Sequence, residues 1–338
     1  MSKVKIITTI DYETFGNGEG DVRECMIKPM DQMIAVANKY GVPLTLMAEM
    51  CSYEAFKKEE EAGRLPADYR PASRIREQLK ACVQSGHDVQ LHLHPQWTNY
   101  HYQDRWSVDL SRWKISSLSY GEMAALLKQG KEELEAMLKP VKPDYSCFVF
   151  RAGAWCIQPE KEVLGAMKAA GLKLDSSVAP NSRFESSLTE YDFRGMPDKA
   201  YWFVGHDLRK ETETGILEIP IYTRSYSFQD KVYYKALRWM KNVRSQSYEN
   251  TGAKRKKSFL CKFRPAATML DFCLMSDDEM LAMVEDAARR FAHLEVIPVV
   301  AIGHSKLYDN AKNSASFIRK AFKRGYTFGT FSEVMAHV

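Results

Sequence analysis

The sequence predicts an α/β protein built on a mostly parallel sheet, and three observations support this prediction. Short apolar runs rich in β-branched and aliphatic residues alternate with amphipathic segments, as strands and crossover helices do in α/β proteins. The 338 residues are 45% hydrophobic and 27% charged, which is typical of a soluble globular protein and leaves room for one large α/β barrel. No internal repeat and no linker rich in proline, glycine or serine divides the chain, so we expect one domain over residues 1–338.

Seven of the apolar runs are expected to be strands. In chain order they span residues 4–10, 43–48, 88–93, 147–151, 172–176, 216–221 and 297–302. Helices are expected between most of them. One covers residues 21–39, and two others begin at the capping-box pairs Ser119/Glu122 and Ser276/Glu279.

Charge and cysteine content exclude several classes of protein. The 48 basic and 43 acidic residues leave a formal charge of +5, which is too small to indicate nucleic-acid binding by the whole chain. Seven cysteines without a CxxC pair fit reduced thiols better than disulfides or a zinc ribbon. No apolar stretch approaches 18 residues and no signal-peptide core is present, so we expect a soluble, cytoplasmic protein without a transmembrane segment.

A basic insertion is expected at about residues 222–270. Residues 221–264 carry twelve lysines and arginines against two acidic residues. Such a charge run is most often a solvated surface segment. It can also form a cationic flank for an anionic substrate or a membrane surface.

Polar side chains gather at the ends of the first and third expected strands. Side chains two apart in a strand share a face, so Asp11 and Glu13 point together, as do His92 and His94. A carboxylate pair suits a division between metal binding and proton removal, although a loop pair or a helix cap is the commoner meaning. Neutral imidazoles on one face can hold zinc, and otherwise they are buried and hydrogen-bonded.

Three later strands also end in polar residues. Arg151, Asp175 and His304 each close an apolar run. The arginine must meet a carboxylate or stay hydrated, because it cannot lose its charge. A single polar residue at a strand end is usually a loop or capping residue. Polar residues at the carboxyl ends of five strands indicate an active site, since the carboxyl-terminal face of α/β barrels carries their catalytic residues.

The ordered motifs T-I-D-Y-E, L-H-L-H-P, F-R-A-G-A-W, L-D-S-S and I-G-H-S resemble those of the polysaccharide deacetylases, the NodB-homology carbohydrate esterases. The resemblance covers about residues 4–335. It implies a distorted (β/α)7 barrel in a single domain. It also implies a metal-dependent hydrolase that removes the acetyl group from an N-acetylated sugar, with zinc as the expected divalent cofactor.

The resemblance assigns a role to each motif residue. Asp11 matches the catalytic base and Arg151 the arginine that orients it, while Glu13 and His92 match metal ligands. His304 matches the general acid. Asp175 matches the fourth-motif aspartate, which we expect to orient His304.

Two departures from the family pattern concern the metal ligands. Most members space their metal histidines H-x-x-x-H, but Gln96 stands four residues after His92. The second ligand is then His94 by strand geometry, with His87 and His101 as alternatives. Many members have two adjacent aspartates in the first motif, so Asp11 itself is an alternative metal carboxylate.

Two tryptophans follow catalytic motifs directly and are candidates for stacking on a sugar. These are Trp97 and Trp155, which could equally cover the barrel mouth. The basic insertion favours an anionic or lipid-linked carbohydrate. Two other functions stay open, namely hydrolysis of another C–N bond such as a cyclic amide, and glycan binding by a degenerate site. The sequence does not indicate an oligomeric state.

Overall fold

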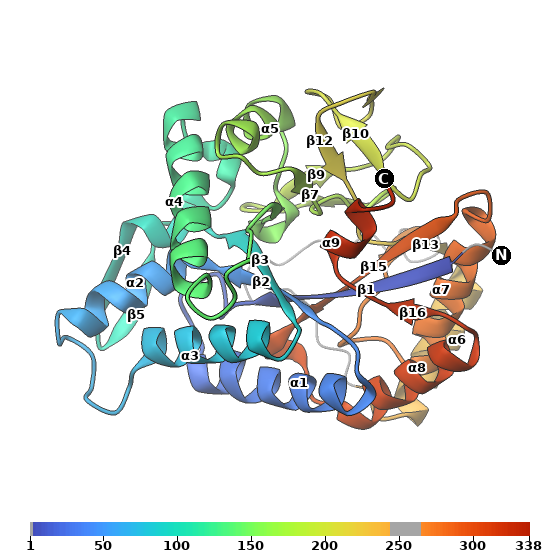
Figure 1. Cartoon of the computed structure of the whole chain (residues 1–338), viewed down its shortest axis with the longest axis horizontal. Helices are drawn as coiled ribbons and strands as arrows, with labels where there is room; N and C mark the ends of the chain where they lie inside the picture. Colours follow the sequence, from blue (N-terminus) through green and yellow to red (C-terminus); the bar gives the residue numbers. More distant parts are fainter. Residues whose placement is uncertain (1–2, 244–264) are drawn as a thin grey trace.

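A computed structural model describes residues 3–243 and 265–338, and its central feature is a curled, mostly parallel sheet (Figure 1). The strands are hydrogen-bonded in the order β11-β10-β12-β7-β6-β3-β2-β1-β15, and β16 pairs with β1. Their bounds are β1 Lys3–Tyr12, β2 Thr45–Glu49, β3 Asp88–Leu93, β6 Val149–Ala152, β7 Leu174–Asp175, β10 Trp202–Val204, β11 Glu211–Thr212, β12 Ile216–Glu218, β15 Val296–His304 and β16 Thr327–Phe328.

All seven expected strands are present, as β1, β2, β3, β6, β7, β12 and β15, and they are parallel to their neighbours within this group. In β2, β6, β7, β12 and β15 every residue is buried. This is why these strands show as continuous apolar runs and not as alternating patterns. The antiparallel edge strands β10 and β11 lengthen the sheet beyond what we expected.

The sheet curls because the chain after β12 returns to β15. Ile221 forms an isolated parallel bridge with Val300, and Asp271 forms another with Ile302. These two bridges connect the chain that follows β12 to β15, which lies at the other end of the strand order. The expected distorted (β/α)7 barrel is thereby confirmed.

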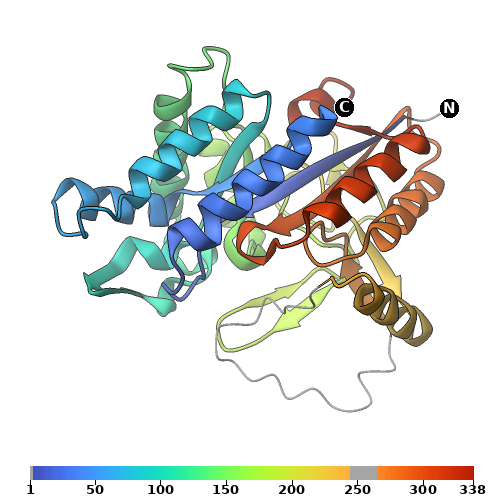
Figure 2. The same cartoon turned by 90° about the horizontal axis from the view of Figure 1, so that it is seen from below.

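Helices cover the outside of the sheet (Figure 2). The helices α7, α8 and α1 pack in succession, as do α2, α3, α4 and α5. Their bounds are α1 Lys28–Tyr40, α2 Met50–Glu61, α3 Pro71–Gln84, α4 Tyr120–Leu138, α5 Glu160–Ala169, α6 Phe228–Met240, α7 Asp277–Arg290, α8 Ala311–Lys323 and α9 Phe331–Met335.

The helix starts agree with the capping patterns in two places and differ in a third. Ser119 and Glu122 form the expected capping box at α4, and Ser276 caps α7 by accepting from the Glu279 amide. The single helix expected over residues 21–39 is instead a π-helical turn, Arg23–Ile27, followed by α1. Pro29 near the start of α1 has no amide hydrogen to continue the regular ladder, which accounts for the break.

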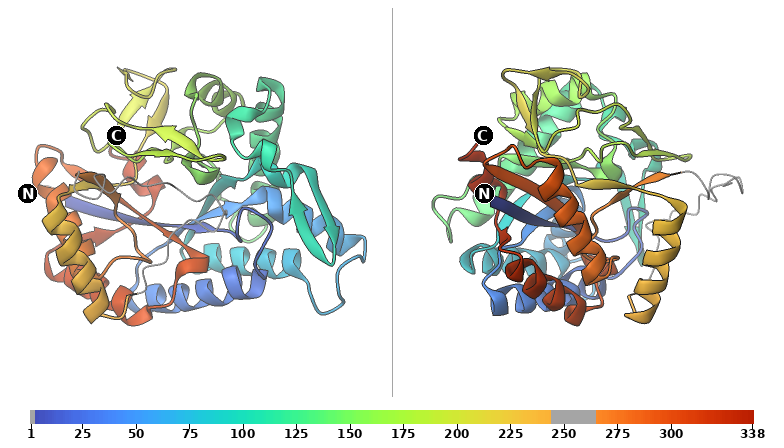
Figure 3. Two further views of the ribbon diagram at one scale, coloured as in Figure 1. Left: turned by 180° about the vertical axis from the view of Figure 1, so that it is seen from behind. Right: turned by 90° about the vertical axis from the view of Figure 1, so that its right-hand side faces the viewer.

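Three two-stranded ribbons lie outside the main sheet, formed by β4 (Tyr100–Gln103) with β5 (Arg105–Val108), β8 (Arg183–Glu185) with β9 (Glu190–Asp192), and β13 (Thr223–Tyr226) with β14 (Ala266–Met269). Figure 3 shows β13 and α6 at the periphery of the molecule. They belong to the expected basic insertion, whose residues 244–264 lie outside the described residues. Within the described ranges, every helix is too short or too polar to cross a bilayer.

Candidate active site and metal centre

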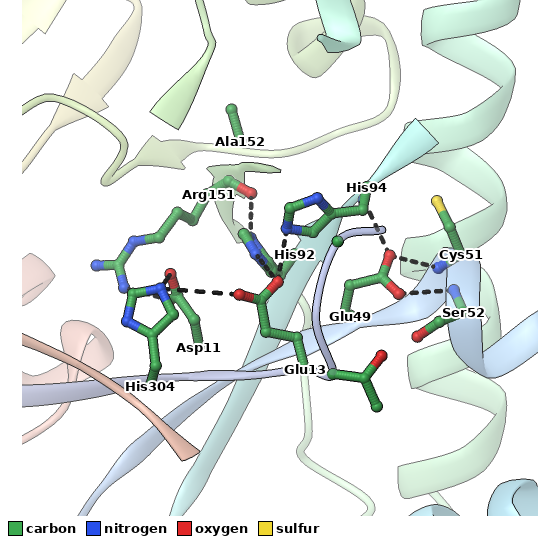
Figure 4. A network of polar contacts seen from close by, with 12 residues as sticks. Asp11, Glu13, Glu49, Cys51, Ser52, His92, His94, Arg151, Ala152 and His304 are labelled. Atoms are coloured by element: carbon green, nitrogen blue, oxygen red, sulfur yellow. Dashed lines mark hydrogen bonds and ion pairs between the residues drawn. The ribbon is translucent and has the colours of Figure 1, made fainter. Parts of the chain in front are cut away.

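The polar strand-end residues meet at the carboxyl end of the sheet. The register places Asp11 of β1 beside His304 of β15 and His92 of β3 beside Arg151 of β6. Glu13 follows β1 directly. Figure 4 shows these side chains pointing toward one another. Parallel strands bring their carboxyl ends to the same edge of a barrel, and this explains the convergence of residues distant in sequence.

Glu13, His92 and His94 form a compact buried cluster that could hold a metal ion. One ligand atom from each lies within 4.8 Å of the others. Oε2 of Glu13 lies 2.6 Å from Nε2 of His94 and 3.3 Å from Nε2 of His92. A carboxylate with two imidazoles is a donor set typical of catalytic zinc.

The hydrogen bonding of His92 also fits a metal ligand. Its Nδ1 lies 2.8 Å from the carbonyl oxygen of Arg151, which can only accept, so Nδ1 carries the proton. In the neutral ring Nε2 then presents a lone pair toward the Glu13 carboxylate. Two facing lone pairs call for a proton or a cation between them, and metal-binding histidines commonly donate to a backbone carbonyl in this way.

The contact of His94 with Glu13 also fits a metal ligand. Nε2 of His94 has no hydrogen-bond partner of good geometry among the described residues, although Oε2 of Glu13 is only 2.6 Å away. On the other side of the ring, the Gln96 amide nitrogen lies 3.0 Å from Nδ1. Gln96 thus contacts the candidate ligand His94 at the point where the family pattern would have a histidine, and it supports that ring without belonging to the cluster.

The alternative histidine ligands lie elsewhere. His87 precedes β3, at its amino end, and its Nδ1 accepts a hydrogen bond from the Leu44 amide. His101 lies on β4, where it is exposed. Neither belongs to the cluster of Glu13, His92 and His94.

Asp11 and Arg151 form a buried ion pair next to this cluster. Nη1 of Arg151 donates to Oδ1 of Asp11 over 2.7 Å and to Oγ1 of Thr9 over 2.9 Å. Nε of Arg151 donates to the Ser176 carbonyl. The other carboxylate oxygen of Asp11, Oδ2, lies 3.5 Å from Nε2 of His304.

The protonation states follow from burial and from neighbouring charges. Burial raises the pKa of Asp11, but Arg151 and the nearby histidines lower it more, so the pKa lies below its usual value. Burial lowers the pKa of His304 to about 4, although Asp11 and Glu13 oppose this shift. At neutral pH the carboxylate of Asp11 is therefore ionised and the imidazole of His304 is neutral.

The L-D-S-S motif supports Arg151, whose Nε and Nη2 donate to the carbonyl and the hydroxyl of Ser176. Asp175 accepts hydrogen bonds from the hydroxyl and the amide of Ser177, and Glu218 of the adjacent strand β12 is paired with it in the register. Burial, followed by the charge of Asp175, raises the pKa of Glu218 well above its usual value. The two carboxyl groups can thus share a proton. The expected orientation of His304 by Asp175 stays a prediction, since the described contacts of Asp175 are with Ser177 and Glu218.

Two residues that we did not predict hold the cluster in place. Nζ of Lys306 donates to Oε1 of Glu13 over 2.7 Å and to the Thr14 carbonyl over 2.8 Å. Glu49, which ends β2, accepts from the His94 amide over 2.9 Å and caps the start of α2. Glu49 ends an apolar strand as Asp175 does, so the same signal could have found it. For Lys306, the only sequence feature that pointed to the site was its position two residues after His304.

The two tryptophan candidates have different surroundings. Trp97 is 2% exposed, and its ring packs against Phe56 and Trp106 at centroid distances of 5.3 and 5.6 Å. An indole enclosed in this way packs in the core and has no free face for a sugar. Trp155 is 9% exposed and meets the ring of His304 edge-on at 5.9 Å. Trp155 therefore borders the candidate site.

The backbone at Trp155 is strained. Ala154 and Trp155 have φ angles of 51° and 58°, a region that residues with a side chain seldom adopt. Gly153 precedes them, and a Cβ atom there would lie 2.6 Å from the Leu93 carbonyl oxygen and 2.9 Å from Nδ1 of His94. Such strain is characteristic of functional sites, where the surrounding structure enforces it.

Comparisons with known proteins find similarity only among solved structures. No family model and no curated protein sequence matches this chain. The 4-alpha-glucanotransferase of Thermococcus litoralis has a TM-score of 0.52 at 10% identity, over 100% of this chain and 41% of that one. At this identity the likeness shows a shared fold.

Two further similar structures have TM-scores below one half. A protein assigned as a polysaccharide deacetylase from Mycobacterium smegmatis gives 0.49 at 12% identity, over 100% of this chain and 90% of that one. A CE4 family pseudoenzyme from Bacillus anthracis gives 0.44 at 10% identity, over 98% and 66%. Both likenesses are too weak to assign a function to this chain.

Proposed function

We propose that the protein is a metal-dependent hydrolase that removes the acetyl group from an N-acetylated sugar. The observation that carries this proposal is the placement of a buried carboxylate–diimidazole cluster beside the ion pair of Asp11 with Arg151 and beside His304. Hydrolysis of an amide needs activation of water and protonation of a poor leaving group. This site offers residues for both functions.

Glu13, His92 and His94 would hold the divalent cation, which we expect to be zinc. A cation bound there supplies Lewis acidity, which polarises an acyl oxygen and makes water more acidic. Lys306 and Glu49 keep the ligands in place, since they contact the Glu13 carboxylate and the His94 amide. These contacts fit a preorganised site.

Asp11 is the proposed base. Its carboxylate is ionised at neutral pH, and Arg151 fixes its orientation through Oδ1. The remaining oxygen, Oδ2, can accept the proton of the attacking water. The same oxygen lies 3.5 Å from Nε2 of His304.

His304 is the proposed proton donor to the leaving amine. Because burial keeps the free imidazole neutral at pH 7, His304 must first take up a proton within the site. Its position beside Asp11 suits a relay in which the proton removed from water passes to the amine. Trp155 packs edge-on against the His304 ring and is the proposed sugar contact.

The finer properties of the substrate are also proposals. The basic excess of residues 221–264 favours an anionic or lipid-linked N-acetylated sugar. The six described cysteines are free thiols, which supports a reducing compartment such as the cytoplasm.

The test is acetate release from a panel of N-acetylated amino sugars, measured on protein purified without chelator. We expect release to stop after removal of metal by EDTA and to return with zinc. His94→Ala should lose both bound zinc and activity, whereas the matched change His101→Ala on the exposed β4 should lose neither. Hydrolysis of cyclic amides without acetate release would favour the other C–N hydrolase. Protein that binds glycans without binding zinc, cobalt or nickel would favour a degenerate site.

A further inference from the structure

The outward face of α6 is unusually apolar. The four most exposed large hydrophobic side chains among the described residues all belong to this helix: Trp239 is 80% exposed, Met240 63%, Tyr233 62% and Val232 54%. We call these four residues the α6 patch. Single exposed hydrophobic residues are common on proteins, but a group of this kind on one element indicates an interaction surface.

The spacing of the α6 patch places its members on one side of the helix. Val232 and Tyr233 lie about one helical turn before Ala236, which is also exposed. They lie about two turns before Trp239 and Met240, so all five residues share one side of the helix. Figure 3 shows α6 at the edge of the molecule, so its outer side faces away from the sheet.

The other side of α6 is already anchored to the protein. Tyr234 is buried and stacks on Tyr226 at a centroid distance of 5.0 Å. Nε of Arg238 donates to Glu279 of α7 over 2.7 Å. Lys241 forms ion pairs with two aspartates at the start of α7. The fold therefore does not need the α6 patch to hold this helix.

Helix α6 itself carries three basic residues, Lys231, Lys235 and Arg238, and one acidic residue, Asp230. Lys235 lies exposed on the helix, while Arg238 and Lys241 are neutralised by the acidic residues of α7. Asp230 caps the start of the helix through Ser227. A second copy of this chain would bring its own Lys231 and Lys235 to the contact, so self-association is opposed by repulsion.

We propose that the α6 patch docks on the surface of an anionic lipid bilayer. Tryptophan, tyrosine and methionine side chains enter the interfacial region readily, and lysine side chains can extend to lipid phosphates. The contact is peripheral. This proposal is independent of the hydrolase function, because it rests on α6 and not on the strand-end residues.

The experiment is co-sedimentation of the full chain with vesicles. We expect binding to vesicles of phosphatidylcholine mixed with phosphatidylglycerol, weaker binding at high salt, and little binding to phosphatidylcholine alone. Because Trp239 is the most exposed tryptophan, its fluorescence should shift to shorter wavelength on the mixed vesicles. Trp239→Ser should remove this shift and lower the partition coefficient about tenfold.

A matched pair of variants controls for general loss of hydrophobicity. Tyr233→Ser should weaken vesicle binding, whereas Tyr120→Ser, which removes a 48% exposed tyrosine from α4, should not. The proposal is overturned if the wild-type protein does not bind anionic vesicles, or if it binds neutral vesicles as strongly as anionic ones. It is equally overturned if Tyr233→Ser and Tyr120→Ser bind anionic vesicles equally well. It is also overturned if light scattering shows a dimer that Trp239→Ser dissociates, since the α6 patch would then be a subunit interface.

Discussion

Lys306 and Glu13 are joined by a buried ion pair in which Nζ lies 2.7 Å from Oε1. Oε2 of the same carboxylate faces the two imidazoles of His92 and His94. The oxygens of Glu13 thus have different partners, a fixed cation on one side and the candidate metal site on the other. Lys306 therefore neutralises this buried carboxylate when no divalent ion does so.

Lys306→Met should destabilise the metal-free protein more than the zinc-loaded protein. Without the ammonium group, Glu13 is left buried without its nearest fixed cation, which typically costs about 3 kcal/mol of unfolding free energy. Zinc would supply a replacement charge. Urea unfolding in EDTA and in zinc measures the difference, and Lys306→Arg serves as the control that keeps the charge. An equal loss under both conditions would mean that Lys306 stabilises the fold only by packing.

Gly153→Ala should displace His94 and weaken zinc binding. The added Cβ would lie 2.6 Å from the Leu93 carbonyl oxygen and 2.9 Å from Nδ1 of His94, so one of them must move. Disturbed support of a ligand commonly lowers metal affinity by about 10- to 100-fold. Titration calorimetry with zinc measures the affinity.

Gly121→Ala is the matched control for this change. A Cβ at residue 121 meets no atom within 4 Å, and alanine is favoured over glycine in a helix such as α4. Its zinc affinity should equal that of the wild type. Unchanged affinity in Gly153→Ala as well would show that the strand ends tolerate the extra atom and that His94 is not held by this contact.

Much of the fold was predictable because its strands are buried on both faces. Such strands appear as continuous apolar runs, and seven runs gave the seven parallel strands. The antiparallel edge strand β11 is polar and partly exposed, so it forms no apolar run, and in its partner β10 only the two end residues are buried. The same strand ends also predicted which residues would converge, since parallel strands share one carboxyl edge.

Contacts between distant residues were not predictable in the same way. The pairing of Asp175 with Glu218 depends on which strand lies next to β7, and sequence order does not give strand order. Trp97 follows the L-H-L-H-P motif closely, yet it packs against Phe56 of α2. Lys306 reaches Glu13 across 293 residues of chain. Each of these contacts is set by tertiary packing.

Asp11→Asn should keep zinc bound and abolish turnover. The amide cannot accept a proton from water, and loss of a general base commonly lowers kcat by about 10²- to 10⁴-fold. Metal analysis of the purified variant and acetate release measure the two effects. Loss of zinc together with activity would instead identify Asp11 as a metal ligand.

The stability of Asp11→Asn must be measured alongside its activity. The change leaves the guanidinium of Arg151 buried without a carboxylate, which destabilises proteins by about 3–5 kcal/mol when no other partner remains. Thr9 and the Ser176 carbonyl keep their hydrogen bonds with Arg151, so we expect a smaller loss. A folded variant with zinc and without activity supports the base role.

Asp271 should make the protein less stable as the pH rises from acid to neutral. Burial raises the pKa of Asp271 to about 7, although the Leu274 and Cys273 amides and Arg238 oppose this shift. The unfolded carboxyl group titrates near 3.9, so between about pH 4 and about pH 7 the folded state binds more protons than the unfolded state. The unfolding free energy therefore falls with rising pH across this window, by at most about 4 kcal/mol.

Asp271→Asn isolates this effect. The asparagine oxygen can still accept from the Cys273 and Leu274 amides, each 2.8 Å from Oδ1, but the side chain no longer titrates. Urea unfolding at several values between about pH 4 and about pH 8 should give a shallower decline in the variant than in the wild type. Other carboxylates titrate in both proteins, so their contributions cancel in the difference. Parallel curves would show that Asp271 ionises in the folded protein as readily as in the unfolded chain.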